Sequence, residues 1–372
     1  MCTRPLFPRA ARGGYLDSAA EGLPAPGVAD AVAEYLAEKA RGTPGRLRHF
    51  AVEHEARVAA AALLGSEADD TVFLPSASDA LNIFVTSIPW KTGDRVVTTD
   101  LEFPSNVLPW LALGERGVEV VVVPSREGAL ELDDLKAAIN EHTRVVTISQ
   151  VSYKTGAWFP HTAELAEAVH AVGGLLCVDA TQALGRCRVP LAGVDYLVAS
   201  TFKWLLSLHG SAITYMSPHM RGKFSLAGVG WYSVSDVFSE RRFSEYTLKE
   251  GAACLVAGMP NFSALYGVRA SLEFLNRLNL PQEQSRTNAL ARNLRSRLAS
   301  FGLEMLTPAD ERFTSGIVSF SHAGCLRIMT ELDSRGIVVW GGDGRVRASL
   351  HYYNDESDVD DLLTAIQEVL SL

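Results

Sequence analysis

The chain has only five cysteines and no long apolar run. The sequence contains no uninterrupted stretch of about 18 apolar residues, the length needed to cross a membrane. The N-terminus has no apolar segment of signal-peptide length. The cysteines form no CxxC pair and have no histidine at metal-ligand spacing, so we expect neither a disulfide framework nor a metal site. We therefore expect a cytoplasmic protein without a membrane partner, with mostly reduced core cysteines at Cys2, Cys177, Cys187, Cys254 and Cys325.

Basic runs and low-complexity segments are also missing. The 372 residues carry a net charge of −9, and lysines and arginines are interleaved with acids, which argues against nucleic acid as a partner. Hydrophobic residues make up 47% of the chain and charged residues 21%, which is typical of a globular protein. A chain of this length predicts two domains.

Seven short apolar runs alternate with segments long enough for crossover helices. Residues 25–64 have helical spacing interrupted at 42–45 by Gly-Thr-Pro-Gly, which predicts two helices joined by a turn. Runs that are apolar on both faces are typical of a mostly parallel sheet covered by helices on each side. We therefore predict an α/β large domain with strands at 71–74, 95–98, 118–123, 145–149, 175–178, 196–199 and 212–216.

The pattern changes after residue 250. Residues 261–301 have helical spacing, strand patterns follow at 316–321 and 346–350, and the stretch 356–370 predicts a closing helix. These elements form a smaller α+β domain. The predicted organisation is an N-terminal arm at 1–24, a large domain at 25–250 and a small C-terminal domain at 251–372.

Polar residues follow two of the predicted strands. Asp179 comes directly after strand 175–178, with Gln182 three residues later, and Lys203 follows strand 196–199. Alone, the lysine would be read as a surface residue and the aspartate as a helix cap. In an open parallel sheet, however, neighbouring strand ends meet at one edge, so the two groups are expected to lie together. Pyridoxal 5′-phosphate (PLP) requires such a pair, because a lysine amine forms its Schiff base and a carboxylate keeps its ring nitrogen protonated.

A small polar turn at 74–82 joins a predicted strand to a predicted helix. Backbone N–H groups at a helix N-terminus, assisted by serine hydroxyls, make a phosphate cradle. Capping alone also explains serine at such a position. The turn at Ala77 and Ser78 is therefore a candidate phosphate site only in combination with the lysine and the carboxylate.

From residue 15 to residue 350 the chain resembles the class V aminotransferase family, the fold-type I PLP-dependent enzymes that include cysteine desulfurases and selenocysteine lyases. The resemblance rests on Tyr-Leu-Asp-Ser-Ala-Ala at 15–20, on the Asp179 and Lys203 segments, and on Arg-Ala-Ser-Leu at 347–350. It implies that Lys203 is the catalytic Schiff-base lysine and that Asp179 pairs with the pyridine nitrogen. It also implies a hydrogen bond from Gln182 to the phenolic oxygen of PLP and a phosphate site made by Ala77, Ser78 and Ser200.

Three aromatic residues depart from the family pattern near the cofactor, and one of them, Phe202, replaces the histidine often found just before the lysine. Phe103 occupies the place of a histidine that stacks on the ring, and an aromatic face still suits stacking without the acid–base option of histidine. Tyr153 stands where an asparagine near the cofactor oxygen is common. Its phenol is expected either to face the substrate or to pack as a core aromatic.

Substrate-binding residues are implied at two other places. Arg347 matches the arginine that binds the α-carboxylate of the substrate, a task suited to the planar guanidinium fork. Its neighbour Arg345 is the alternative for the same task. Arg46 and His49 fall where family members place residues on the substrate side.

A persulfide-forming cysteine is absent from the loop where a cysteine desulfurase carries one. Residues 336–344 contain no cysteine, and the nearest upstream one, Cys325, lies beyond a predicted helix. A desulfurase of that type is therefore disfavoured. The expected reaction, through an external aldimine, is C–S β-lyase action on a cysteine S-conjugate in a biosynthetic pathway. Decarboxylating oxidative deamination of a similar conjugate and transamination are the alternatives.

The resemblance also implies a homodimer with shared active sites and a small amino-acid substrate. The polar stretch at 228–243 is the expected region that one chain contributes to the site of the other. The remaining hypothesis is a non-enzymatic, PLP-sensing role. It is disfavoured because no DNA-binding segment is apparent in the sequence.

Overall fold

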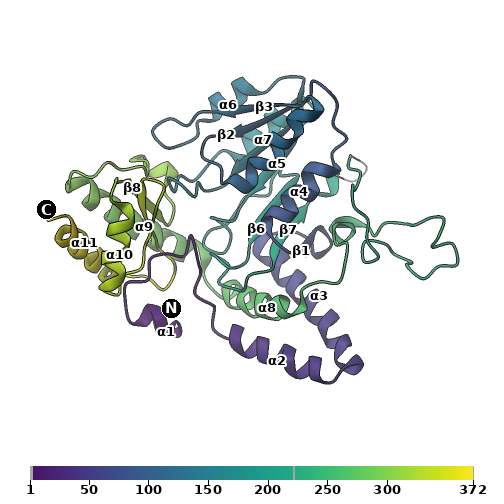
Figure 1. The fold of residues 1–372 in the computed structure, drawn as a ribbon, viewed down its shortest axis with the longest axis horizontal. Coiled ribbons are helices and arrows are strands. Elements are labelled where there is room, and N and C mark those ends of the chain that lie inside the picture. Colours follow the sequence, from purple (N-terminus) through teal and green to yellow (C-terminus); the bar gives the residue numbers. More distant parts are fainter. Residues whose placement is uncertain (1–2, 221–222, 372) are drawn as a thin grey trace.

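A seven-stranded sheet lies at the centre of the molecule (Figure 1). The computed structural model describes residues 3–220 and 223–371, so the predicted core cysteine Cys2 lies outside the described residues. The strands are β1 (Thr71–Leu74), β2 (Arg95–Thr99), β3 (Glu119–Val123), β4 (Thr143–Ser149), β5 (Leu175–Asp179), β6 (Tyr196–Ser200) and β7 (Ala212–Met216).

The strand order is β1-β7-β6-β5-β4-β2-β3. Five strands, β6, β5, β4, β2 and β3, run parallel to one another, whereas β7 runs antiparallel to both β1 and β6. All seven predicted strands are present. The prediction of an α/β fold with a mostly parallel sheet is therefore confirmed.

Helices cover both faces of this sheet because its central strands are apolar on both sides. One face is covered by α4 (Ala77–Ser87) and α5 (Leu108–Leu111), and there Phe84 stacks on Tyr196 with ring centroids 4.5 Å apart. The other face is covered by α3 (Arg46–Leu64), α6 (Leu132–Ala138), α7 (Thr162–Ala171) and α8 (Phe262–Asn276), with α2 (Val28–Ala40) packed outside α3 and α8. Within 3–220 and 223–371, no helix is long and apolar enough to cross a membrane.

A three-stranded antiparallel sheet forms the second, smaller unit. Its order is β8 (Ile317–Ser321), β10 (Arg345–Ser349) and β9 (Trp340–Gly342), and it packs against α9 (Leu280–Ser300), α10 (Cys325–Ser334) and α11 (Glu356–Leu370). The closing helix has the predicted bounds. The short strand β9 was not predicted, because three residues with two glycines give no strand periodicity.

The predicted helical stretch at 261–301 is two helices. Asn279 caps α9 by accepting a hydrogen bond from the backbone of Gln282, and Pro281 stands in the first turn. The first helix, α8, packs in the core of the large sheet, whereas α9 contributes Leu290 and Leu294 to the second core. The domain boundary at residue 250 stays a prediction. Because α8 and α9 pack in different cores, we propose that the boundary lies between these two helices.

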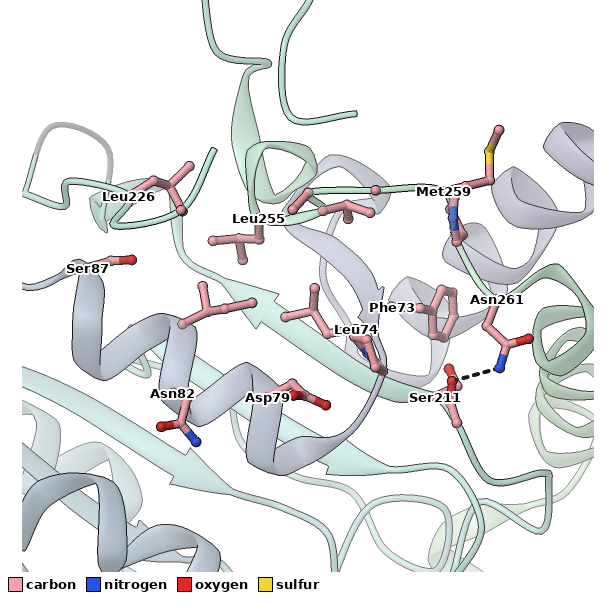
Figure 2. A pocket seen from close by; sticks show the side chains of 18 of the residues that line it. Phe73, Leu74, Asp79, Asn82, Ser87, Ser211, Leu226, Leu255, Met259 and Asn261 are labelled. Atoms are coloured by element: carbon pink, nitrogen blue, oxygen red, sulfur yellow. Dashed lines mark hydrogen bonds between the residues drawn. The ribbon is translucent and has the colours of Figure 1, made fainter. Parts of the chain in front are cut away.

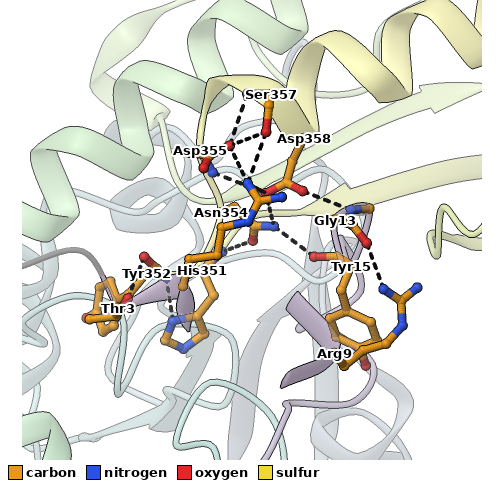
Figure 3. A network of polar contacts seen from close by, with 12 residues as sticks. Thr3, Arg9, Gly13, Tyr15, His351, Tyr352, Asn354, Asp355, Ser357 and Asp358 are labelled. Atoms are coloured by element: carbon orange, nitrogen blue, oxygen red, sulfur yellow. Dashed lines mark hydrogen bonds and ion pairs between the residues drawn. The ribbon is translucent and has the colours of Figure 1, made fainter. Parts of the chain in front are cut away.

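The N-terminal arm packs against the small unit (Figure 3). The side-chain amide of Asn354 donates a hydrogen bond to the carbonyl of Tyr15 at 2.8 Å, and the backbone N–H of Gly14 donates to Asp358 at 2.8 Å. Asp17 then pairs with β10 through an isolated bridge. The arm thereby brings Asp17 to the side of β10 that faces the large sheet.

Residues 223–250 form an irregular segment whose outer part projects to the right in Figure 1. Phe238 and Phe243 on this segment are 82% and 89% exposed. These two side chains are largely exposed in the single chain, and the segment includes the whole stretch, 228–243, that is expected to reach another chain.

Candidate active site

The carboxyl ends of β4, β5 and β6 meet at one edge of the large sheet. Ser149 at the end of β4 is paired with Asp179 at the end of β5, and Ser200 ends β6. A cavity of about 170 Å³ opens at this edge. It brings together eight of the predicted site residues: Ala77, Ser78, Phe103, Tyr153, Asp179, Gln182, Ser200 and Lys203.

Lys203 reaches the cavity between two aromatic rings. Its Nζ lies 5.4 Å from the ring centroid of Phe103 and 5.5 Å from that of Phe202. Burial lowers the pKa of Lys203, and the nearby Arg347 acts in the same direction, whereas Asp179 and Asp17 oppose the shift. A lysine in this environment is more easily present as the neutral amine, the form that reacts with a carbonyl carbon.

Asp179 is buried at the bottom of the cavity. One carboxylate oxygen accepts a hydrogen bond from the backbone N–H of Thr181 at 2.8 Å. Burial raises the pKa of Asp179, although Thr181 and Lys203 favour its ionised form. A protonated ring nitrogen placed against this carboxylate would compensate the burial of its charge.

Thr181 lines the same cavity and was not predicted as a site residue. Its backbone N–H binds Asp179, and its hydroxyl oxygen accepts a hydrogen bond from the backbone of Ser200 at 3.2 Å. It therefore connects the ends of β5 and β6. The sequence does carry a signal for it, since a residue two positions after an aspartate commonly closes an Asx-turn.

Gln182 is fixed at both ends of its amide. Its Nε2 donates to the carbonyl of Ala19 at 3.0 Å, and its Oε1 accepts from the indole N–H of Trp204 at 2.6 Å. An amide nitrogen carries two hydrogens, so one N–H remains for a ligand in the cavity. This arrangement agrees with the predicted hydrogen bond to a phenolic oxygen, which stays a prediction.

The N-terminus of α4 forms the opposite wall. Ser76 caps the helix by accepting a hydrogen bond from the backbone of Asp79 at 3.0 Å. The N–H groups of Ala77 and Ser78, in the first turn, have no carbonyl partner within the helix because of their position. Such a terminus attracts an anion.

The residues around the cavity fit PLP. A partly buried amine, a buried carboxylate with a raised pKa, an amide with a spare N–H and a helix N-terminus all line one cavity. They would hold the aldehyde carbon, the ring nitrogen, the phenolic oxygen and the phosphate respectively. Phe103, whose ring meets that of Tyr153 edge-on at 5.1 Å, would lie against the ring of the cofactor.

Arg347 extends the site toward the small unit. Its guanidinium donates to the carbonyl oxygen of Tyr153 at 3.1 Å and lies 3.7 Å from Oδ1 of Asp17. Burial lowers the pKa of Arg347 to about 10 and raises the pKa of Asp17 to about 6. The Nε of Arg347 and the Oδ1 of Asp17 are buried without a hydrogen-bond partner, so a carboxylate ligand would find an incompletely satisfied guanidinium.

Asp17 was not predicted as a site residue. It stands in the 15–20 segment that carries part of the resemblance, but no spacing relates it to residue 347. Only the packing of the N-terminal arm on β10 makes them neighbours.

Arg46 and His49 lie outside the cavity. Both belong to α3, where Arg46 is exposed with its guanidinium 5.7 Å from the ring of Phe50. His49 is buried, lies 3.0 Å from the hydroxyl of Tyr266 and stacks on Phe262. Within one chain these contacts serve the packing of α3 on α8, so a substrate-side role for either residue remains a prediction that requires a second chain.

Comparison with known proteins gives one family. The family model described as aminotransferase class-V matches residues 14–362. A probable cysteine desulfurase of Methanothermobacter thermautotrophicus is 30% identical and matches 96% of this chain and 95% of its own length. The apo structure of a cysteine desulfurase from Thermococcus onnurineus has a TM-score of 0.91 at 26% identity, covering 100% of this chain and 98% of that one. The cystine C–S lyase C-DES, in complex with its product cysteine persulfide, shares the fold with a TM-score of 0.87 at 21% identity, over 96% of this chain and 98% of that one.

Proposed function

The chain belongs to the class V aminotransferase family and is a PLP-dependent enzyme, and we propose that it acts as a C–S β-lyase on a cysteine S-conjugate. The bound cofactor supplies an electron sink for the carbon that loses its proton. The overall reaction is R–S–CH₂–CH(NH₃⁺)–COO⁻ plus water giving R–SH, pyruvate and ammonium. The Cβ–S bond breaks, its electron pair leaves on sulfur, and no oxidant is consumed.

The side chains of the cavity suit this reaction. Lys203 would hold the cofactor and, once displaced by the substrate amine, would take the Cα proton on Nζ, because its lowered pKa favours the neutral base. Asp179 would keep the proton on the ring nitrogen, and Arg347 would bind the α-carboxylate. The walls made by Phe103 and Tyr153 would limit the access of water.

The shape of the stretch at 336–344 is the observation that favours a lyase over a desulfurase of the persulfide type. Its last part forms β9 and a tight turn into β10, with Asp343 at φ 48° and Gly344 at φ 70°. A hairpin turn of this kind leaves no loop that could carry a mobile thiol. Within residues 3–220 and 223–371, every cysteine is buried and none lines the cavity: Cys177, Cys187, Cys254 and Cys325.

Two other reactions start from the same bound substrate. Decarboxylating oxidative deamination would cleave the bond to the α-carboxylate instead of the Cα–H bond, and transamination would return the proton to the cofactor. The cystine C–S lyase named above has the same fold, so the fold is compatible with C–S cleavage.

Product analysis of the PLP-loaded protein tests the proposal. We expect incubation with S-alkyl-L-cysteines to release thiol and pyruvate in equal amounts. The Lys203→Ala variant should lose both this activity and the visible absorbance of the lysine-bound cofactor. Carbon dioxide with an aldehyde would instead support oxidative decarboxylation, and a keto acid that keeps its sulfur would support transamination. Either result, without thiol release, rejects the lyase proposal.

A homodimer is the second part of the proposal. The projecting segment at 223–250 exposes Phe238 and Phe243, and a mostly apolar cavity of about 520 Å³ lies beside α4 (Figure 2). Figure 2 places Leu74, Leu226, Leu255 and Met259 around this cavity. Its wall includes Pro75 and Asp79, which flank the residues of the candidate phosphate site, so a second chain seated there would adjoin the active site.

A further inference from the structure

A second buried arginine lies on the same strand as Arg347. Arg345 and Arg347 alternate along β10 with Val346 and Ala348, which enter the core of the small unit. The two arginines therefore share the opposite face of the strand, the one toward the large sheet. Residues two apart on a strand lie about 7 Å from each other.

Arg345 is connected to the cavity through aromatic rings. Its guanidinium carbon lies 5.2 Å from the ring centroid of Tyr153 and 4.7 Å from that of Trp340. Tyr153 lines the cavity and meets Phe103, over which the amine of Lys203 is placed. Arg345 thus adjoins Tyr153, a residue of the cavity wall, without lining the cavity itself.

The charge of Arg345 is poorly compensated. Its side chain is 2% exposed, and its Nε is buried without a hydrogen-bond partner. Its acidic partner is Asp343, which contacts Nη1 from the β9–β10 turn and is 72% exposed. The guanidinium carbon of Arg347 lies 5.1 Å from the centroid of the Trp340 ring, the same ring that Arg345 contacts. Two buried cations therefore face one buried carboxylate, Asp17, and one carboxylate that solvent largely screens.

We propose that Arg345 binds a second carboxylate of the substrate, at the end of the sulfur substituent, while Arg347 binds the α-carboxylate. The attachment of this carboxylate through sulfur rests on the proposed lyase function. Asp343 would leave Arg345 when the substrate carboxylate arrives, since an exposed aspartate at a turn is free to move into solvent. The substrate class is an S-(carboxyalkyl)-L-cysteine.

The spacing of the two arginines selects a short linker. In S-carboxymethyl-L-cysteine five bonds separate the two carboxyl carbons, which spans roughly 6 Å when extended. This length is comparable with the separation of the two arginines on β10. The planar guanidinium of each can take a carboxylate through two parallel hydrogen bonds.

A matched pair of substrates isolates the charge. S-carboxymethyl-L-cysteine and S-carbamoylmethyl-L-cysteine have nearly the same shape and differ in the terminal carboxylate. We expect the PLP-loaded wild-type protein to prefer the acid by about 10- to 100-fold in kcat/KM, the effect of one charge-assisted hydrogen-bonded contact. The Arg345→Met variant should reduce this ratio to about 1, and Arg327→Met, on the exposed side of α10, should leave it unchanged.

A second variant covers the case in which Arg345→Met does not fold. Asp343→Asn removes the carboxylate that competes for Arg345, so it should raise the preference for the acid. A purely structural Arg345–Asp343 pair would not change the ratio in this direction. A wild-type ratio near 1, or an equal loss for both substrates in Arg345→Met, overturns the proposal.

Binding of sulfur-free analogues separates this proposal from the lyase function. L-2-Aminoadipate and its 6-amide replace the sulfur by a methylene, and calorimetric titration of the PLP-loaded protein gives their affinities. Tighter binding of the acid that Arg345→Met abolishes supports the second carboxylate site even if no thiol is ever released. Thiol release with equal affinity for acid and amide would leave the lyase function standing and reject the site.

Discussion

The carboxyl group of Glu102 lies directly behind the cavity, next to Phe103 in the chain. It is buried and accepts four hydrogen bonds, from the hydroxyl of Thr99, the amide of Asn106, and both the backbone and the hydroxyl of Ser149. Ser149 lines the cavity, so Glu102 fixes the end of β4 against the loop that carries Phe103. Burial raises the pKa of Glu102 to about 7, and the charge of Asp179 adds to the rise, whereas the hydrogen bonds from Ser149 and Asn106 oppose it.

This raised pKa predicts a pH dependence of stability. The folded protein holds the proton of Glu102 up to about pH 7, whereas an unfolded glutamate loses it near pH 4.5. Because the folded state binds more protons in this window, the contribution of Glu102 to the free energy of unfolding falls as the pH rises from about 4.5 to about 7. The shift corresponds to about 3 kcal/mol at most.

Urea denaturation between pH 5 and pH 8 measures this effect. Glu102→Gln should flatten the dependence of the unfolding free energy on pH by about 3 kcal/mol, since the amide does not titrate in this range. Glu115→Gln, at an exposed position, should retain the wild-type dependence. Equal slopes in the wild-type protein and both variants would contradict the assignment.

At the level of elements, the turn that follows β6 decides where Lys203 points. The hydroxyl of Thr201 donates to the carbonyls of Leu208 and Ser211, and Leu206 takes the left-handed conformation at φ 54°. The N-terminal arm braces this turn from outside, because the backbone N–H of Gly22 donates to the carbonyl of Phe202 at 2.8 Å. The arm and the lysine turn are therefore joined by a direct backbone hydrogen bond.

A side chain at position 22 should break this contact. A Cβ on Gly22 would lie 1.9 Å from the carbonyl oxygen of Lys203, so either the arm or the lysine turn must move. We expect Gly22→Ala to lower the free energy of unfolding by about 2 kcal/mol or more and to weaken PLP binding. Denaturant titration and absorbance titration with PLP measure the two effects.

Gly114→Ala is the matched control for this substitution. Nothing lies within 4 Å of a Cβ at Gly114, so an alanine there should be close to neutral. If Gly22→Ala and Gly114→Ala bind PLP equally well, the arm does not support the lysine turn.

For the whole molecule, the three most exposed aromatic side chains among residues 3–220 and 223–371 all belong to the segment 223–250. Phe238, Phe243 and Tyr246 are 82%, 89% and 64% exposed. Contiguous apolar residues at the surface usually mark an interface. In the proposed homodimer they would become buried against the partner, next to the apolar cavity beside α4 (Figure 2).

Sedimentation equilibrium tests the dimer. We expect the wild-type protein to have twice the chain mass of 40.2 kDa. The double variant Phe238→Ser, Phe243→Ser should shift the equilibrium toward single chains, because it removes apolar surface from the interface. Leu326→Ser, 61% exposed on α10, serves as the control and should remain dimeric. A wild-type protein that sediments as a single chain would reject the dimer and, with it, any shared active site.

The sequence alone determined the elements and the residues at the strand ends. Hydrophobic periodicity is local, so it located the seven strands and predicted that Asp179 and Lys203 follow two of them. Neighbouring parallel strands end at the same edge, which was sufficient to expect the two side chains in one site. The resemblance then supplied roles for Gln182, Phe103 and Arg347, and these roles await experiment.

Only the tertiary structure decided which distant segments meet. Asp17 lies beside Arg347 because the N-terminal arm joins the edge of a sheet some 330 residues later, and no local pattern encodes such a contact. The same holds for Arg345. The sequence shows it as one more arginine on a strand, whereas the fold buries it beside Tyr153 with its Nε unpaired. Side-chain periodicity fixes the face on which a residue lies, but the charge balance of a site depends on how separate elements pack against one another.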